Sequence, residues 1–244
     1  MFSLAVNYRS LIDLFLNNSN CLLCGQSLRN GELICGGCHS DLPWLQCCCL
    51  QCAEPLRGLS SSPSHSRCGK CLSKPPKFDR TLAPMSYEFP VNFLISQLKH
   101  QAKPDLLQLC SELFVHRFKA EISQQPPQLI IPVPLHRSRL YSRGYNQAAE
   151  WARYLSQQLD IPYDQNICKR GLATPHQQGL SAKQRRRNLA KAFSVEAQQK
   201  LHHVAIVDDV MTTGTTLDLL AHELRKSGIE RIDAWCFART PSQR

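Results

Sequence analysis

Short hydrophobic runs alternate with longer amphipathic stretches along the C-terminal two thirds of the chain. The short runs predict strands, and they are Thr81–Glu88, Leu129–Ile131, Val204–Val207 and Arg231–Ala238. Apolar residues at helical spacing predict helices over Val91–Lys99, Pro104–Lys119, Asn146–Leu159 and Thr215–Ser227. Gly228 follows the last of these helices, where glycine commonly ends a helix. Strands that alternate with helices favour a parallel α/β sheet.

The N-terminal part of the chain has a different composition, dominated by cysteine. Most of the 13 cysteines lie there, in four Cys-x2-Cys pairs. The pairs are Cys21 and Cys24, Cys35 and Cys38, Cys49 and Cys52, and Cys68 and Cys71. The run Lys74-Pro75-Pro76-Lys77 follows the last pair, and we place the domain boundary there. We therefore expect a cysteine-rich module over residues 1–75 and an α/β domain over residues 76–244.

These cysteine pairs predict two structural zinc sites. Each pair places two thiolates on one tight turn, and a spacing of C-x2-C-x15-C-x2-C is typical of zinc. Four thiolates leave no open position for water, so such sites do not catalyse. A disulfide framework and an iron–sulfur cluster are the alternatives, and the pairing can be sequential or interleaved. Arg9 and Asp13 interrupt the N-terminal apolar stretch, which argues against a secretory signal. Cys110, Cys168 and Cys236 fit small buried hydrophobic residues.

The segment Val204–Leu217 carries the strongest chemical signal. A predicted strand ends in Asp208 and Asp209, and a helix begins a few residues later. Between them lies a loop of Thr212, Thr213, Gly214, Thr215 and Thr216. Free N–H groups at a helix N-terminus favour an anion, whereas paired carboxylates favour hydroxyls or Mg²⁺. The expected ligand carries a phosphate, a vicinal diol and a metal-bound polyphosphate.

This arrangement resembles the phosphoribosyl-pyrophosphate (PRPP) signature of type I phosphoribosyltransferases. The resemblance implies that Asp208 and Asp209 hold the ribose diol and that residues 212–216 hold the 5′-phosphate. Members that act on 6-oxopurines carry an aspartate at the position of Thr212, where it serves as a base. Thr212 cannot do so, and any base must lie elsewhere.

A second anion-binding segment is expected after the strand Leu129–Ile131. The run 132–147 leaves a strand end, turns at two prolines and offers Arg137, Arg139 and Arg143. The runs P-V-P-L and R-G-Y-N-Q-A, the later Q-Q-G-L before Arg186 and Asn188, and the cysteine pairs together resemble the ComF family. Its members join a double zinc ribbon to a phosphoribosyltransferase domain, and the γ-proteobacterial branch, named for gluconate metabolism or DNA utilisation, looks closest. The resemblance implies a pyrophosphate loop made of Val133, Pro134, Leu135 and His136, with Arg143 nearby.

The net charge of +10 is concentrated between Arg137 and Lys191. This charge favours polyphosphate or single-stranded nucleic acid, with Tyr141 and Tyr145 available to stack on bases. Within it, Thr174–Asn188 is polar and cationic, which suggests a mobile flap over a polyphosphate or a nucleic-acid contact, with an exposed helix face as the alternative for its arginines. It contains His176, a candidate proton carrier, and Arg185–Arg187.

Three functions remain open: a phosphoribosyl transfer from Mg-PRPP to an unidentified acceptor, a single-stranded DNA-handling protein, and a PRPP sensor without chemistry. The family resemblance implies a role in DNA uptake or in the use of DNA as a nutrient, with DNA-uptake proteins as further partners. No run of 18 apolar residues predicts a membrane span, and we expect a cytoplasmic protein.

Overall fold

The computed structural model describes residues 19–28, 31–56, 66–100, 103–171, 193–196 and 200–242. The chain divides into two compact units, Met1–Leu42 and Pro43–Arg244. The boundary expected near residue 75 does not coincide with this division, because the second cysteine-rich segment belongs to the larger unit.

In the first unit, the described residues from 19 onward form one short hairpin and one short helix. Strands β1 (Ser19–Asn20) and β2 (Ser27–Leu28) are antiparallel, and helix α2 (Gly36–Ser40) follows them. Cys35 is the N-cap of α2, and its sulfur accepts a hydrogen bond from the backbone N–H of Cys38. Two cysteine pairs therefore lie on two tight backbone turns.

The second unit is built on a parallel sheet. Its strands are β3 (Arg80–Leu82), β4 (Met85–Ser86), β5 (Leu129–Pro132), β8 (His203–Met211) and β9 (Arg231–Arg239). Their order is β3-β9-β8-β5, and β4 pairs with the far end of β9. Every pairing in this sheet is parallel, which confirms the α/β prediction.

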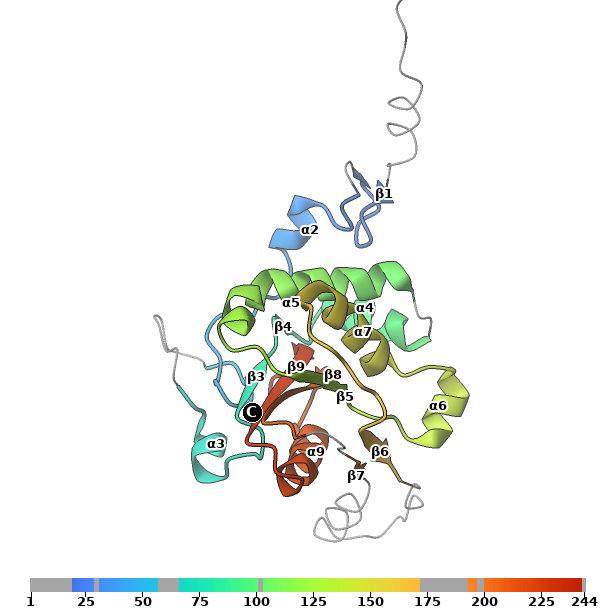
Figure 1. The fold of residues 1–244 in the computed structure, drawn as a ribbon. Helices are drawn as coiled ribbons and strands as arrows, with labels where there is room; N and C mark the ends of the chain where they lie inside the picture. The colour runs from blue at the N-terminus through green and yellow to red at the C-terminus, as the bar shows by residue number, and fades with distance from the viewer. Residues whose placement is uncertain are drawn as a thin grey trace, which may run out of the picture. The chain divides into compact units, whose positions relative to one another are not determined.

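Helices cover both faces of this sheet. Figure 1 shows α4 (Val91–His100), α5 (Pro104–Gln124) and α7 (Gln147–Leu159) on one side and α9 (Thr215–Lys226) on the other. On the first side Phe114 packs against Trp151 and Trp235, with ring centroids 5.4 and 5.5 Å apart. On the α9 side Ile206, Leu220 and Cys236 belong to one hydrophobic core.

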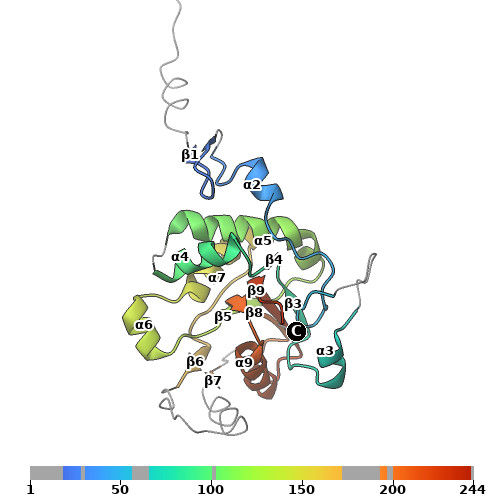
Figure 2. The same cartoon turned by 180° about the vertical axis from the view of Figure 1, so that it is seen from behind.

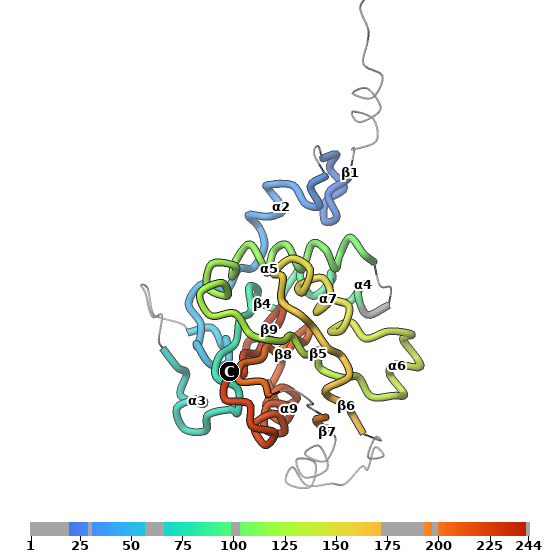
Figure 3. Tube along the Cα trace, viewed as in Figure 1, coloured from blue at the N-terminus to red at the C-terminus, as the bar shows by residue number. Residues whose placement is uncertain are grey.

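The second cysteine-rich segment packs into that same core. Leu45 and Ala53 are buried in it beside Phe78 and Met211. Helix α3 (Gly69–Ser73) follows, with Cys68 as its N-cap. In Figure 3 the light-blue trace of residues 43–56 runs beside β3, where the backbone N–H of Thr81 donates to the carbonyl of Leu50 at 3.0 Å.

Most predicted elements are present with shifted ends. The predicted strand Thr81–Glu88 is two strands, since Pro84 interrupts the pairing with β9. The strand Val204–Val207 is longer and continues through both acidic residues to Met211, because β9 pairs with it that far. Helix α5 begins at Pro104 as expected and runs to Gln124.

Three short elements between β5 and β8 were not predicted. They are helix α6 (Arg137–Arg143) and the antiparallel strands β6 (Cys168–Arg170) and β7 (Phe193–Val195). Each has seven residues or fewer and is too short to show a clear period. Within the described residues, no helix combines the length and apolar character that crossing a membrane requires.

Candidate functional site

The acidic pair lies near the end of the central strand β8. Each carboxylate accepts a hydrogen bond from the backbone N–H of the next residue. Asp209 N donates to Asp208 Oδ1 at 3.0 Å, and Val210 N donates to Asp209 Oδ1 at 2.7 Å. Successive residues of a strand point to opposite faces. Consistent with this, Asp208 lines the cup at the N-terminus of α9, while Asp209 lines a small apolar cavity beside Cys110 and Trp151. Both acidic residues also line one larger, polar cavity.

The predicted phosphate loop forms a cup at the N-terminus of α9. A cavity of about 30 Å³ is enclosed by Asp208 and residues 210–217. Gly214 is the N-cap of α9 and has a φ of 75°, a conformation that favours glycine. Thr213 Oγ1 lies 2.9 Å from Thr215 Oγ1 and accepts the Thr215 N–H at 3.3 Å. The cup thus combines hydroxyls with a helix N-terminus, where an anion is favoured.

A second cavity, of about 160 Å³, lies against the acidic pair. It contains Asp208, Asp209 and Thr216 from the first motif and Val133, Pro134, Leu135 and Arg143 from the expected pyrophosphate loop. Two segments more than sixty residues apart in sequence therefore meet there, as parallel strands β5 and β8 end at the same edge of the sheet. His136 does not line this cavity. Its Nδ1 accepts the Ser138 N–H at 3.2 Å and so caps helix α6.

Three arginines from two elements line the same cavity. Arg139 and Arg143 come from α6, and Arg170 comes from β6. Burial lowers the pKa of Arg170, nearby Arg139 lowers it further, and Asp208 opposes the change. This cationic group beside a carboxylate pair fits a polyphosphate held with a metal. Sequence reasoning counted Arg170 only as part of the net charge, since no motif marked it.

The N-terminus of α7 holds the proline-rich loop in place. Asn146 Oδ1 accepts the Ala148 N–H at 3.1 Å, and Asn146 Nδ2 donates to the Val133 carbonyl at 3.0 Å. Arg143 Nη1 donates to Gln147 Oε1 at 3.2 Å. Gln147 is buried, lines the cavity, and its Nε2 has no hydrogen-bond partner in the described part of the chain. An unpaired buried donor facing a polar cavity fits a bound ligand.

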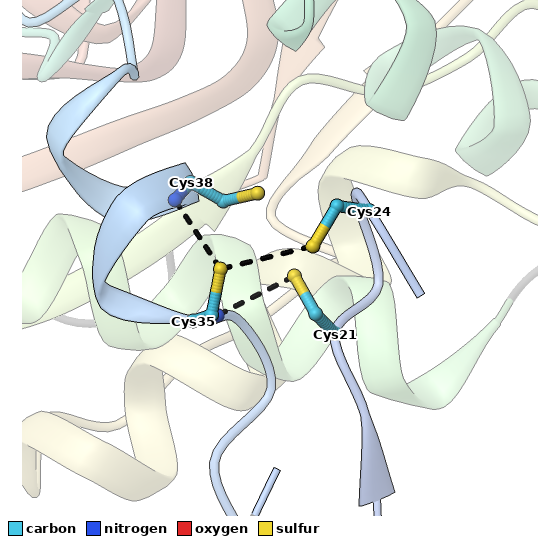
Figure 4. A group of neighbouring side chains, drawn as sticks. All are labelled: Cys21, Cys24, Cys35 and Cys38. Atoms are coloured by element: carbon cyan, nitrogen blue, oxygen red, sulfur yellow. Dashed lines mark hydrogen bonds between the residues drawn. The ribbon is translucent and has the colours of Figure 1, made fainter. Parts of the chain in front are cut away.

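The eight paired cysteines form two clusters, grouped in sequence order. In each cluster the four sulfur atoms lie within 4.8 Å of one another. Figure 4 shows the first cluster, in which Cys21, Cys24, Cys35 and Cys38 point their sulfurs toward one centre. The second cluster contains Cys49, Cys52, Cys68 and Cys71. Four convergent sulfurs fit tetrahedral Zn²⁺, and both clusters are consistent with structural zinc sites.

The environment of the second cluster favours a thiolate. The pKa of Cys49 is lowered to about 4, first because Cys52 donates a hydrogen bond to its sulfur. Burial opposes this shift, and the Cys68 N–H, 3.2 Å from the sulfur, reinforces it. Cys110, Cys168 and Cys236 are buried in the sheet domain, as predicted, and burial raises the pKa of Cys168 to about 12.

Two other predicted features have different outcomes. Tyr141 is exposed on α6, but Tyr145 is partly buried and its hydroxyl donates to the Leu98 carbonyl. The ring of Tyr145 is thus less accessible than that of Tyr141, and its stacking on a base stays a prediction. The predicted flap Thr174–Asn188, with His176 and Arg185–Arg187, lies outside the described residues.

Known families match both parts of the chain. The double zinc ribbon domain matches residues 11–72, and the phosphoribosyl transferase domain matches residues 145–244. Solved structures resemble this chain only loosely. A purine phosphoribosyltransferase from Pyrococcus horikoshii Ot3 is 22% identical, covers 51% of this chain and 69% of its own, and has a TM-score of 0.35.

Two curated relatives are similar along almost their whole length. Competence protein F of Haemophilus influenzae is 37% identical over 231 residues, which cover 91% of this chain and 97% of the relative. The DNA utilization protein YhgH of Escherichia coli O157:H7 is 36% identical over 224 residues, which cover 90% of this chain and 96% of the relative. Because these likenesses extend through the cysteine clusters and the sheet alike, the chain belongs to the ComF family of proteins, which join a double zinc ribbon to a phosphoribosyltransferase domain.

Proposed function

We propose that this protein binds Mg-PRPP in the cavity at the carboxyl edge of the sheet. One observation carries the proposal: the acidic pair, three arginines and the phosphate cup meet in two adjoining cavities that share Asp208 and Thr216. The cup at residues 212–216 takes the 5′-phosphate, and the acidic pair takes the ribose hydroxyls. Arg139, Arg143 and Arg170 face the pyrophosphate.

In this proposal the chain orients the ligand and disperses its charge. Mg²⁺, when bound, adds positive charge at the pyrophosphate oxygens. The arginines stabilise negative charge that develops on the leaving pyrophosphate, since guanidinium groups pair well with phosphate oxygens. Transfer of phosphoribose to an acceptor is the reaction this geometry supports best. A PRPP sensor that binds the same ligand without transfer uses the same residues.

Calorimetry on the wild type and on Asp208→Asn/Asp209→Asn tests the site. The double variant keeps shape but removes charge, so Mg-PRPP affinity is expected to fall by about tenfold or more. Affinity for inorganic phosphate is expected to stay unchanged or to rise, because a repulsion is removed. Asp105→Asn/Glu112→Gln, at two exposed acidic residues of α5, is the charge-matched control. Absence of Mg-PRPP binding by the wild type would exclude the proposal.

A second function, contact with single-stranded DNA, is favoured by helix α6. Tyr141 is 87% exposed there, with Arg137 and Arg139 exposed on the same short helix. An exposed aromatic ring beside arginines can stack on a base while the arginines pair with phosphates. The names of the relatives, which refer to competence and DNA utilization, agree with this role in DNA uptake or in the use of DNA as a nutrient.

A further inference from the structure

Arg239 occupies an unusual position between the second cysteine cluster and the phosphate cup. It is the last residue of β9, and only 4% of its surface is exposed. Its side chain reaches the segment Cys52–Glu54 on one side and the start of the phosphate loop on the other. A buried guanidinium must find partners for its five N–H groups.

Those partners come from both neighbours. Toward the cysteine cluster, Nε donates to the Cys52 carbonyl at 2.9 Å, and Nη2 lies 2.6 Å from Glu54 Oε2. Toward the phosphate loop, Nη1 donates to the carbonyls of Met211 at 3.2 Å and Thr212 at 2.6 Å. Thr240 supplies a further carbonyl. One side chain therefore joins a cysteine ligand's backbone to the backbone that leads into the cup.

Glu54 extends this connection. Its other oxygen, Oε1, accepts the Ser242 N–H at 2.8 Å, so the chain beyond β9 is attached to the same point. The knuckle that carries Glu54 is itself a tight turn, closed by Cys49 N donating to the Glu54 carbonyl and Ala53 N donating to the Cys49 carbonyl, both at 2.8 Å. A metal held by Cys49 and Cys52 would fix this turn.

The cluster and the phosphate cup also share a cavity. A pocket of about 390 Å³ lies between them, with Cys52, Cys68 and Cys71 on one wall and Thr213, Gly214 and Thr215 on the other. Figure 2 shows α3, which follows Cys68, beside strand β3 on this side of the sheet. Gln51 connects the cysteine turn to the chain around β3, since its side-chain Nε2 donates to the Phe78 carbonyl at 3.2 Å and its backbone carbonyl accepts the Thr81 hydroxyl at 2.7 Å.

We propose that the second cysteine site supports the phosphate loop through Arg239, so that phosphoribosyl binding depends on metal in this site and not on metal in the first. The proposal rests on the proposed function of residues 212–216. Arg239 is a positioning residue that fixes the backbone of Met211 and Thr212. Metal loss at the second site frees the turn at Cys52–Glu54 and, through Arg239, loosens the cup.

Two matched variants of the full chain test the dependence. Cys35→Ser/Cys38→Ser removes the second pair of the first cluster, and Cys68→Ser/Cys71→Ser removes the equivalent pair of the second. Metal content, ribose 5-phosphate affinity by calorimetry, and hydrogen–deuterium exchange of residues 210–217 are measured on each. The first variant is expected to bind like the wild type. The second is expected to lose about tenfold or more in affinity and to lose exchange protection in the loop. Equal affinity and equal loop exchange in the two variants would overturn the proposal.

Arg239→Met tests the connection without touching a cysteine. It leaves four carbonyls and the Glu54 carboxylate without their shared donor, a situation that is costly when buried. The variant is expected to keep the metal content of the wild type while the affinity for ribose 5-phosphate falls and loop exchange rises. Arg239→Lys keeps the charge but not the planar fork, and it is expected to recover part of the affinity. A variant that melts earlier but binds ribose 5-phosphate normally would contradict the positioning role.

The exchange measurement separates this proposal from the proposed function. If the wild type binds neither ribose 5-phosphate nor Mg-PRPP, the proposed function fails. Hydrogen–deuterium exchange of residues 210–217 in the two cysteine variants and in Arg239→Met still shows whether the second cysteine site supports this loop. If the Cys68→Ser/Cys71→Ser variant does not fold, Arg239→Met, which keeps every cysteine, decides the coupling instead.

Discussion

At the scale of single residues, the site depends on a few positions whose chemistry has no ready substitute. Gly214 is one of them, since its φ of 75° begins α9 inside the phosphate cup. A side chain there would meet Met211 and Phe78 only at ordinary contact distances, 3.7 and 3.9 Å for the nearest atoms. The constraint on this residue is therefore conformational rather than steric.

Gly214→Val is expected to abolish binding of both Mg-PRPP and ribose 5-phosphate. A β-branched residue at positive φ costs about 1–2 kcal/mol or more, and the loop can relieve it only by leaving the cup geometry. Gly228→Ala is the control, because Gly228 also has a positive φ, of 95°, but lies at the opposite end of α9. Calorimetry with both ligands decides this. Normal binding by Gly214→Val would show that the cup does not hold the phosphate.

At the scale of elements, a buried acid ties three parallel strands together. Asp233 of β9 is fully buried and contacts Arg80 of β3 at 2.7 Å and His203 of β8 at 3.1 Å. Burial raises the pKa of Asp233, but the hydrogen bonds from His203 and Arg80 outweigh it, and the net pKa is lowered. A lowered pKa means that the contribution to stability is present above the unfolded-state pKa and is lost as the pH falls through the folded-state pKa.

Asp233→Asn is accordingly expected to lower the free energy of unfolding at pH 7 by about 3–5 kcal/mol, because the guanidinium of Arg80 loses a buried charged partner. The gap in unfolding free energy between wild type and variant should begin to narrow below the unfolded-state pKa of about 4, and it should close as the pH falls through the lowered folded-state pKa. Urea titrations at steps of about one pH unit between pH 3 and pH 7 measure the free energy of unfolding of both proteins. Glu196→Gln, in an exposed ion pair with Lys169, serves as the control. A gap that does not change with pH would contradict the role given to the charge.

Helix α6 carries a prediction of its own about DNA. Replacing Arg137 and Tyr141 together by alanine should weaken single-stranded DNA binding, since a stacked base contributes about 1–3 kcal/mol. The slope of log affinity against log salt concentration should become less negative by roughly 0.7, because one phosphate contact is lost. Arg117→Ala on α5 is a charge-matched control, exposed and far along the chain from α6. Equal weakening by both variants would mean that the helix has no specific part in binding.

At the scale of the whole molecule, the two cysteine clusters belong to different compact units. The purified chain is expected to contain about two zinc ions, and each paired-cysteine variant about one. Loss of the second cluster should lower the melting temperature of the sheet domain more than loss of the first, because Leu45 and Ala53 are part of the sheet's core. Elemental analysis and differential scanning calorimetry measure both quantities. One zinc per wild-type chain would disprove the two-site assignment.

The sequence by itself determined the parts of this protein that depend on local pattern. Hydrophobic spacing located the strands and helices of the parallel sheet, because a buried face imposes its period on nearby residues. The C-x2-C pairs and the run from Asp208 to Thr216 were readable for the same reason, since ligands that share one turn must lie close in sequence. The pyrophosphate loop came from family resemblance, and four of its five residues do line the cavity.

Only the tertiary structure decided which separate segments meet. Arg170 joins the cavity from β6, and Arg239, which lies 185 residues from Glu54 in sequence, joins the second cysteine site to the phosphate loop. Neither lies in a pattern, because a contact between distant segments leaves no period in the chain. The sequential pairing of the cysteines and the division at Leu42 were decided in the same way. They depend on which side chains share a core, and that is settled by packing across the whole unit.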